Sequence, residues 1–261
     1  MINWPEKVVV LTGASSGIGR EMARLLVGKG AQLVMVARRG EVLLELQNEI
    51  AVDGCMPPLV VVCDVGDSDQ VANLLRQVED RWGAADVLIN NAGRGAYGPF
   101  SDGDLATYNS LVQTNLSGMI YCTKAFLPGM LIRGEGHLAF VSSIVAELPS
   151  PGHAVYCASK FAVNGLAESL EYELAPQGIQ VHLVGPGLVR TEFPKRAGVP
   201  QKRFEQMPSK SALEVAQAVL NAVERGQRKS VPDFFGRQAI KLRRHFPNLA
   251  HCIFKRVFRS F

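Results

Sequence analysis

A glycine-rich turn near the start of the chain is the feature that most limits its possible folds. The turn, Gly13–Gly19, follows a β-branched run at residues 7–12 and precedes a helical pattern with apolar Met22, Leu25 and Leu26. Glycines allow a tight turn and close backbone approach, and a helix N-terminus directs free N–H groups toward an anion. Strand, turn and helix in this order predict a phosphate-binding unit.

Strand patterns alternate with helical patterns through the rest of the chain. Further strands are expected at residues 31–37, 59–63, 86–90, 137–142, 180–184 and 229–232. Such alternation is typical of a parallel sheet between two layers of helices. We therefore predict an α/β fold: a single doubly wound Rossmann-type domain with a mostly parallel seven-stranded sheet and helices on both faces. Ligands of such sheets bind at the carboxyl ends of the strands.

The residues after the second strand bear on the choice of cofactor. An acid there would bind the ribose hydroxyls of NAD, but this chain has Ala37 followed by Arg38 and Arg39. Two guanidinium groups suit a 2′-phosphate, so the pattern favours NADP(H) over NAD(H). The alternative is that both arginines are solvated charges at the entry of a helix.

Other polar and small residues also follow strands. Asp64 and Val65 follow the third strand, where Asp64 could meet an adenine or could cap the helix that begins near Asp67. Asn91, Ala92 and Gly93 follow the fourth strand, and small residues there indicate backbone close to a ligand. The sixth strand leads into residues 185–191.

Tyr156 and Lys160 lie four residues apart, so a helix places both on one face. A free phenol has a pKa near ~10, and a neighbouring ammonium favours the phenolate. Ser143, at the end of the fifth strand, could hold a carbonyl oxygen while the tyrosine passes it a proton. Taken alone, the Tyr–Lys spacing also fits a solvated helix face. Asn115 lies within residues 104–133, which we predict to form one long helix, where its amide can bind backbone and hold a kink or a water.

Together these motifs resemble the classical short-chain dehydrogenase/reductase family over about residues 7–232. Thr12–Gly19 is similar to the family's Thr-Gly-x-x-x-Gly-x-Gly motif, and Asn90–Gly93 to its Asn-Asn-Ala-Gly motif. The family's Ser–Tyr–Lys set, with its thirteen-residue interval from serine to tyrosine, matches Ser143, Tyr156 and Lys160. The neighbouring Ser142 fits this spacing less well.

The resemblance implies an NAD(P)-dependent oxidoreductase that transfers hydride between C4 of the nicotinamide and a carbonyl or carbinol carbon, with no need of a metal. The implied catalytic residues are Ser143, Tyr156, Lys160 and Asn115, the fourth family position. Tyr156 would be the acid in reduction and the base in oxidation, and Lys160 would lower its pKa and bind the nicotinamide ribose. The expected cofactor-binding residues are Gly13, Ser15, Ser16, Gly17, Ile18, Gly19, Arg38, Arg39, Asp64, Val65, Asn91, Ala92, Gly93, Tyr156, Lys160, Pro186, Gly187, Val189 and Thr191.

The substrate is not determined by the sequence. Residues 188–209 are expected to form a lid, and the pocket is expected to accept an apolar carbonyl or alcohol. The side chains expected to line it are Leu148, Pro149, His153, Phe193, Phe204 and Met207. A packing role is an alternative for His153. A catalytically silent NADP(H)-binding regulator or scaffold is the alternative to an enzyme.

The basic character of the chain lies at its C-terminal end. The net charge is +4, and residues 228–261 hold nine Lys or Arg against one acid, Asp233. We therefore expect a catalytic domain at 1–233 and a basic amphipathic extension at 234–261, with two short helices split at Pro247. The extension packs on the domain or on another subunit, or it lies on an anionic membrane surface. The resemblance implies a homodimer or homotetramer, and no motif accompanies the charge that would indicate nucleic-acid binding.

The expected location is the cytoplasm. No apolar run reaches the ~18 residues needed to span a bilayer, and the first residues do not form a secretory signal. Five widely spaced cysteines, an odd number, indicate free thiols in a reducing compartment.

Overall fold

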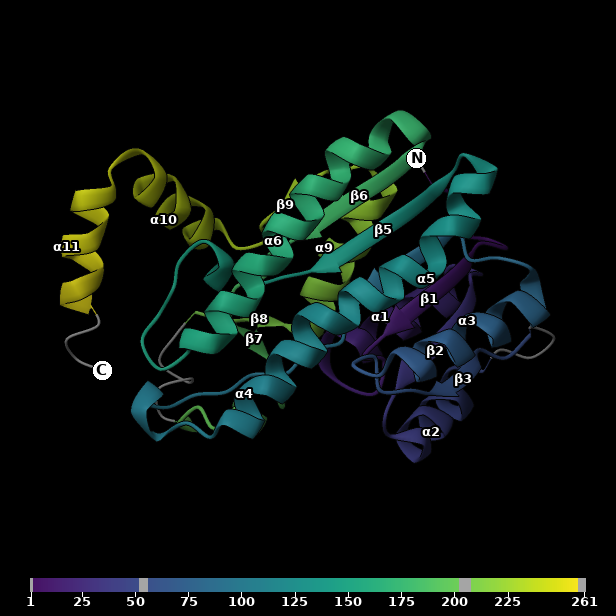
Figure 1. The fold of residues 1–261 in the computed structure, drawn as a ribbon, viewed down its shortest axis with the longest axis horizontal. Helices are drawn as coiled ribbons and strands as arrows, with labels where there is room; N and C mark the ends of the chain where they lie inside the picture. Colours follow the sequence, from purple (N-terminus) through teal and green to yellow (C-terminus); the bar gives the residue numbers. More distant parts are fainter. Residues whose placement is uncertain (1, 52–55, 202–207, 258–261) are drawn as a thin grey trace.

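Seven parallel strands form the central sheet of the computed structural model, which describes residues 2–51, 56–201 and 208–257. Helices lie on both sides of this sheet (Figure 1). In spatial order the strands are β3 (Leu59–Val62), β2 (Gln32–Ala37), β1 (Val8–Thr12), β4 (Val87–Asn90), β5 (Gly136–Val141), β6 (Ile179–Val184) and β9 (Lys229–Ser230). This arrangement confirms the predicted fold.

The β1 strand shows why both faces of the sheet are covered. Its residues are buried and alternate between two cores, with Val9 and Leu11 in one and Val8 and Val10 in the other. A strand buried on both faces needs a continuous apolar run, which this strand has. The first core includes α1 (Gly17–Gly28), α2 (Gly40–Ile50) and α9 (Ala212–Glu224), and the second includes α3 (Ser68–Trp82), α5 (Gly118–Arg133) and α6 (Ala154–Leu174).

The strand order reverses between β1 and β4. The chain proceeds from β1 outward to β2 and β3, and then returns to place β4 on the other side of β1. Ligands bind at such a switch point, outside the carboxyl ends of the strands. The glycine-rich turn follows β1 and the Asn90–Gly93 segment follows β4, so the two meet there.

The segment that was predicted as one helix at 104–133 has three parts. Helix α4 (Leu105–Val112) runs into a π-helical turn, η2 (Gln113–Ser117), and then into α5. The three parts follow one another without a break, so a continuous helical segment is present as predicted. The π-helical turn was not predicted, because one wide turn leaves no clear mark on the pattern of apolar residues. Short 3₁₀ turns lie at η1 (Phe100–Asp102), η3 (Ile144–Ala146) and η4 (Ala175–Gln177).

The predicted lid region contains a small second sheet. Strand β7 (Val189–Arg190) pairs with β8 (Lys210–Ser211), and helix α7 (Phe193–Arg196) lies between them in sequence. The two ends of this region are therefore held together by backbone pairing. The sequence analysis did not predict this pair, because strands of two residues are too short to give a pattern.

Two helices follow β9, α10 (Phe234–His245) and α11 (Pro247–Val257), which confirms the predicted split at Pro247. They form an arm beside the sheet domain at the left of Figure 1. Among the described residues, no helix has the length and apolar character that crossing a membrane requires.

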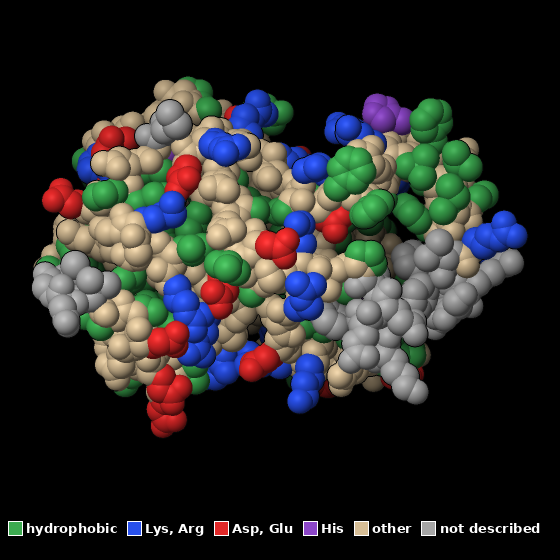
Figure 2. Space-filling model, turned by 180° about the vertical axis from the view of Figure 1, so that it is seen from behind, with side chains coloured by type: hydrophobic (Ala, Val, Ile, Leu, Met, Phe, Trp, Pro, Cys, Tyr) green, Lys and Arg blue, Asp and Glu red, His purple; other side chains and the backbone are tan. Residues whose placement is uncertain are grey.

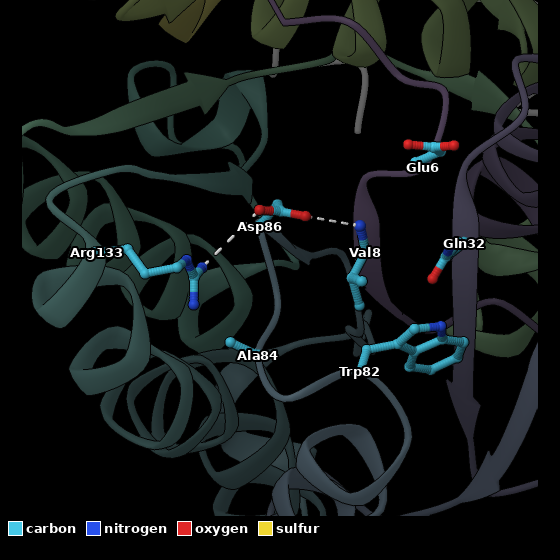
Figure 3. Close-up of a pocket in the computed structure, with 7 residues that line it drawn as sticks. All are labelled: Glu6, Val8, Gln32, Trp82, Ala84, Asp86 and Arg133. Atoms are coloured by element: carbon cyan, nitrogen blue, oxygen red, sulfur yellow. Dashed lines mark hydrogen bonds and ion pairs between the residues drawn. The ribbon is translucent and has the colours of Figure 1, made fainter.

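The amino ends of the strands carry a cavity of about 370 Å³. Figure 3 shows Asp86 accepting a hydrogen bond from the Val8 amide (2.9 Å) with Arg133 nearby, 4.0 Å from the carboxylate. This cavity lies at the opposite ends of the strands from the Gly13–Gly19 turn, Ser143, Tyr156 and Lys160, which are at or near the carboxyl edge.

Candidate active site

The predicted site residues gather along the carboxyl edge of the sheet. Most of them directly follow a strand: the Gly13–Gly19 turn after β1, Arg38 and Arg39 after β2, Asp64 and Val65 after β3, Asn91–Gly93 after β4, Ser143 after β5 and Pro186–Thr191 after β6. The others lie on helical segments, Asn115 in η2 and Tyr156 and Lys160 on α6. Parallel strands end at one edge, so residues far apart in sequence become neighbours.

The glycine-rich turn has room for a ligand but none for side chains. Gly13 has φ +70°, and a Cβ there would lie 2.9 Å from Ala92 Cα. A Cβ on Gly19 would overlap the carbonyl oxygen of Gly13. Backbone N–H groups at the start of α1 therefore remain open to close approach by a phosphate, so the turn fits a dinucleotide.

Thr12 joins this turn to the Asn-Asn-Ala-Gly segment. Its Oγ1 donates to the Ile89 carbonyl (3.2 Å) and accepts from the amides of Asn91 and Ala92 (both 2.9 Å). Asn91 Nδ2 donates in return to the Thr12 carbonyl (2.9 Å). One buried hydroxyl and one amide therefore fix the two loops that flank the switch point.

Asn115 is fully buried in the π turn and holds the loop after β4. Its Oδ1 accepts from the Arg94 amide (2.8 Å), and its Nδ2 donates to the Arg94 carbonyl (2.9 Å) and to Ser159 Oγ (3.1 Å). The predicted binding of backbone by this amide is present. The extra residue in the π turn is a feature that recurs at functional sites.

Ser143, Tyr156 and Lys160 converge at the start of α6. Ser143 Oγ accepts from the Val145 amide (3.3 Å) and is hydrogen-bonded to the Tyr156 hydroxyl. Lys160 lies one turn beyond Tyr156, only 4% exposed, and donates to the Val141 carbonyl (2.9 Å). A lysine this buried does not belong to a solvated helix face.

The neighbouring Ser142 has a different environment. Its Oγ donates to Asn164 Oδ1 (2.7 Å), which ties β5 to α6. Ser143, by contrast, bonds the phenol of Tyr156. The structure therefore separates the two serines as the sequence spacing suggested.

Burial shifts both titratable groups away from their charged forms. It raises the pKa of Tyr156 to about 12, although the hydrogen bond from Ser143 acts in the opposite direction. It lowers the pKa of Lys160 to about 8. Lys160 was predicted to lower the pKa of Tyr156, but in the structure the ammonium is directed at the Val141 carbonyl and the hydrogen bond with Ser143 has this effect.

The two arginines after β2 have different partners. Arg39 Nη2 donates to Ser15 Oγ (3.0 Å) and to the Ser15 carbonyl (3.3 Å), so it lies against the glycine-rich turn. Arg38 is more exposed and pairs with Asp64 at 3.6 Å. Asp64 does not cap α3, because the side chain of Asp67 accepts from the first helical amides.

One residue at this turn was missed. Arg196, on α7, donates through Nη1 to Ser16 Oγ (3.2 Å) and pairs with Glu192. It lies 180 residues from Ser16 in sequence, within a region predicted only as a lid. No short motif could have placed it there.

A cavity of about 320 Å³ opens beside Tyr156. Its lining residues come mainly from the loop after β4 and from η1 and α4, and include Tyr97, Pro99, Asp102, Thr107 and Tyr108. These residues were not predicted, although those that directly follow the Asn-Asn-Ala-Gly motif could have been inferred from their closeness to it.

Only part of the predicted pocket lining is tested by the described residues. Phe193 lies with its ring centroid 5.7 Å from that of Tyr156, and His153 lies 6.1 Å from it. The His153 ring also contacts the Tyr97 ring in a tilted arrangement, with 5.0 Å between the ring centroids. The residues that line this cavity include none of the four described residues of the prediction, Leu148, Pro149, His153 and Phe193, and Phe204 and Met207 lie outside the described residues.

The family model described as short chain dehydrogenase matches residues 7–201. The chain belongs to this family, as a classical short-chain dehydrogenase/reductase. Dehydrogenase/reductase SDR family member 7B of Mus musculus is 34% identical, over 93% of this chain and 78% of the relative. This short-chain dehydrogenase is thus an oxidoreductase, as predicted.

Solved structures agree with this assignment. A short-chain dehydrogenase from Sphingobium yanoikuyae in complex with NADPH is 28% identical, covers 87% of this chain and 88% of its own, and has a TM-score of 0.81. One from Burkholderia phymatum in complex with NAD is 25% identical, covers 95% and 96%, and has a TM-score of 0.87. These neighbours support a nicotinamide cofactor for this chain. One of them is in complex with NADPH and the other with NAD.

Proposed function

We propose that this short-chain dehydrogenase reduces a carbonyl group on an apolar substrate with NADPH, or catalyses the reverse oxidation of a secondary alcohol. The observation that carries the proposal is the Ser143–Tyr156 hydrogen bond beside buried Lys160, at the edge where the glycine-rich turn opens. A hydroxyl pair and a cation in one buried site suit proton transfer to a carbonyl oxygen.

Each residue has a role that follows from its position. The Tyr156 hydroxyl gives its proton to the substrate oxygen, and the Ser143 hydroxyl holds that oxygen. Once its ammonium turns from the Val141 carbonyl, Lys160 stabilises the phenolate and binds the nicotinamide ribose, and Asn115 keeps the loop at Arg94 in place. When bound, the nicotinamide supplies the hydride.

The preference for NADPH rests on Arg39 and Arg38. Arg39 is held against Ser15 in the glycine-rich turn, and no acid stands at the end of β2 to bind ribose hydroxyls. The remaining expected cofactor contacts lie on the same edge: Gly13, Ser16, Gly17, Ile18, Asp64, Val65, Asn91–Gly93, Pro186, Gly187, Val189 and Thr191.

The first test is a fluorescence titration of the full chain with NADPH and NADH. We expect tighter binding of NADPH, and a loss of that preference in Arg38→Ala/Arg39→Ala. Arg76→Ala, at an exposed position on α3, is the control and should bind like the wild type. Equal affinity of the wild type for the two nucleotides would show that the arginines do not select the 2′-phosphate.

The second test is turnover. We expect NADPH-coupled reduction of at least one member of an apolar ketone and aldehyde panel, and its loss in Tyr156→Phe with NADPH binding retained. Nucleotide binding without any turnover would favour the alternative, a silent NADP(H)-binding regulator or scaffold.

We further propose the division into a catalytic domain at 1–233 and an extension at 234–261, a cytoplasmic location, and a homodimer or homotetramer. The extension carries a surface that supports a peripheral membrane contact. Six Lys or Arg and no acid lie between residues 234 and 257. Large apolar side chains on the same two helices are exposed: Phe234, Phe235, Phe246, Leu249 and Ile253.

Figure 2 shows hydrophobic side chains gathered with Lys, Arg and His side chains on this arm. Apolar groups beside cations match the boundary of an anionic bilayer. We expect the chain to co-sediment with phosphatidylserine vesicles and less with neutral ones, and Phe246→Ser/Leu249→Ser to stay in solution. A change of that variant to a smaller oligomer, without vesicle binding by the wild type, would instead assign the surface to a subunit contact.

A further inference from the structure

Helix α7 lies against the glycine-rich turn. A Cβ placed on Gly17 would lie 3.1 Å from the Thr191 methyl, so the chain just before α7 touches the start of α1. From α7, Arg196 Nη1 reaches Ser16 Oγ at 3.2 Å. The Arg196 side chain thereby stands at the point where α1 presents its free amides.

A second guanidinium contacts the same turn. Arg39 donates to Ser15, the residue before the serine that Arg196 contacts. Burial lowers the pKa of Arg39, and the charge of Arg196 lowers it further, so the two cations repel each other. Glu192 acts in the opposite direction on Arg39 and pairs with Arg196.

Among the described residues, the guanidinium groups around the turn outnumber the carboxylates that pair with them. Glu192 faces two guanidinium groups, and Asp64 is already paired with Arg38. Like charges held together favour an anion between them, and a guanidinium binds phosphate through paired N–H donors. The turn itself adds backbone N–H groups to such a site.

We propose that Arg196 binds a phosphate of the dinucleotide, exchanging Glu192 for phosphate oxygens. The proposal rests on the proposed use of a nicotinamide dinucleotide. Ser16 directly precedes α1, so the diphosphate is the expected partner, and the 2′-phosphate near Arg39 is the other source of the same chemistry. Glu192 is then a competitor that holds the guanidinium in the absence of phosphate.

The test is a direct binding titration with NADPH and NADH. Arg196→Gln should weaken binding roughly tenfold or more, the usual effect of losing a hydrogen bond to a charged group. Arg196→Lys should bind nucleotide with an affinity between those of the wild type and Arg196→Gln, because an ammonium keeps the charge but lacks the paired N–H donors of the guanidinium. Glu192→Gln should tighten binding, an effect that a merely structural role of the pair would not produce.

Controls separate this inference from the proposed function. Lys195→Gln changes an exposed cation on the same helix and should bind like the wild type. Melting temperatures without nucleotide should be unchanged in Arg196→Gln, while the upward shift caused by nucleotide should shrink. Raising the salt concentration should reduce the difference in nucleotide affinity between the wild type and Arg196→Gln, because salt screens the attraction between the guanidinium and the phosphate.

The outcomes are distinct. A similar loss for both nucleotides assigns Arg196 to the diphosphate, and a loss confined to NADPH assigns it to the 2′-phosphate. If the wild type and Arg196→Gln bind nucleotide equally well, the inference is overturned. A wild type that binds neither nucleotide overturns the proposed function itself.

Discussion

Replacing Lys160 by methionine should stabilise the fold while removing activity. Burial lowers the pKa of this lysine from 10.5 to about 8. At ~1.4 kcal/mol per pKa unit, the buried ammonium costs about 3 kcal/mol. Methionine has a similar length and no charge, and it loses the hydrogen bond to the Val141 carbonyl, roughly 1 kcal/mol. The net gain in the free energy of unfolding is therefore expected to be about 2 kcal/mol.

The pH dependence identifies the cause. Between pH 8 and about 10.5 the unfolded lysine holds its proton while the folded one releases it, so the wild type becomes more stable as pH rises. The advantage of Lys160→Met is then largest below pH 8 and shrinks toward pH 10.5. Urea unfolding of both proteins at pH 7, 8, 9 and 10 measures this, with Lys124→Met, an exposed lysine on α5, as the control.

Two results would refute the reasoning. Equal or lower stability of Lys160→Met at pH 7 would mean that the ammonium is better solvated or paired than its contacts indicate. An advantage that stays constant with pH would assign the gain to packing and not to charge. Loss of turnover in the same variant would show that the buried cation is retained for chemistry at the expense of stability.

Further predictions concern the residues around it. Asn115→Ala removes three hydrogen bonds of a buried amide and should lower the free energy of unfolding by roughly 2–4 kcal/mol, measured by urea unfolding. Ser143→Ala should lower kcat about 100-fold with nucleotide binding intact, whereas Ser142→Ala should lower stability and change kcat little. Acidification from pH 6.5 toward 4 should destabilise the fold. Burial and the neighbouring histidine lower the pKa of His137 to about 4, so the unfolded chain takes up the proton at a higher pH than the folded chain does. A free energy of unfolding that stays constant over this pH range would contradict this prediction. The rate of alcohol oxidation should rise steadily with pH from 7 to 10, because the pKa of Tyr156 is about 12; a plateau by pH 8 would show that the phenol loses its proton far more easily.

The fold was predictable because its signals are local. The buried strand at Val8–Thr12, the glycines after it and the alternation of strands with helices each follow from the sequence within a short window. The parallel topology then brings the strand ends together, so motifs separated by up to ~180 residues could be assigned to one site. Ser143, Tyr156 and Lys160 are examples.

The features that were missed depend on tertiary contacts. The wide turn at Asn115 exists because its amide binds the backbone of Arg94 on another loop. The contact of Arg196 with Ser16 depends on how the chain returns after β6, and the cavity wall at Tyr97 depends on a loop conformation. Sequence periodicity contains no information on such contacts.

Burial also bears on the direction of the reaction. In the cofactor-free chain, the pKa values of Tyr156 and Lys160 are displaced toward the neutral form of each group by the same cause. A neutral phenol is the proton donor that carbonyl reduction requires, whereas oxidation begins from a phenolate that burial disfavours. The Ser143 hydrogen bond recovers part of that cost, and any further stabilisation must come from Lys160 turning from the Val141 carbonyl toward the phenol. The resting site therefore holds the neutral proton donor that the proposed reduction requires, and this proposed direction is consistent with the NADPH preference proposed from Arg38 and Arg39.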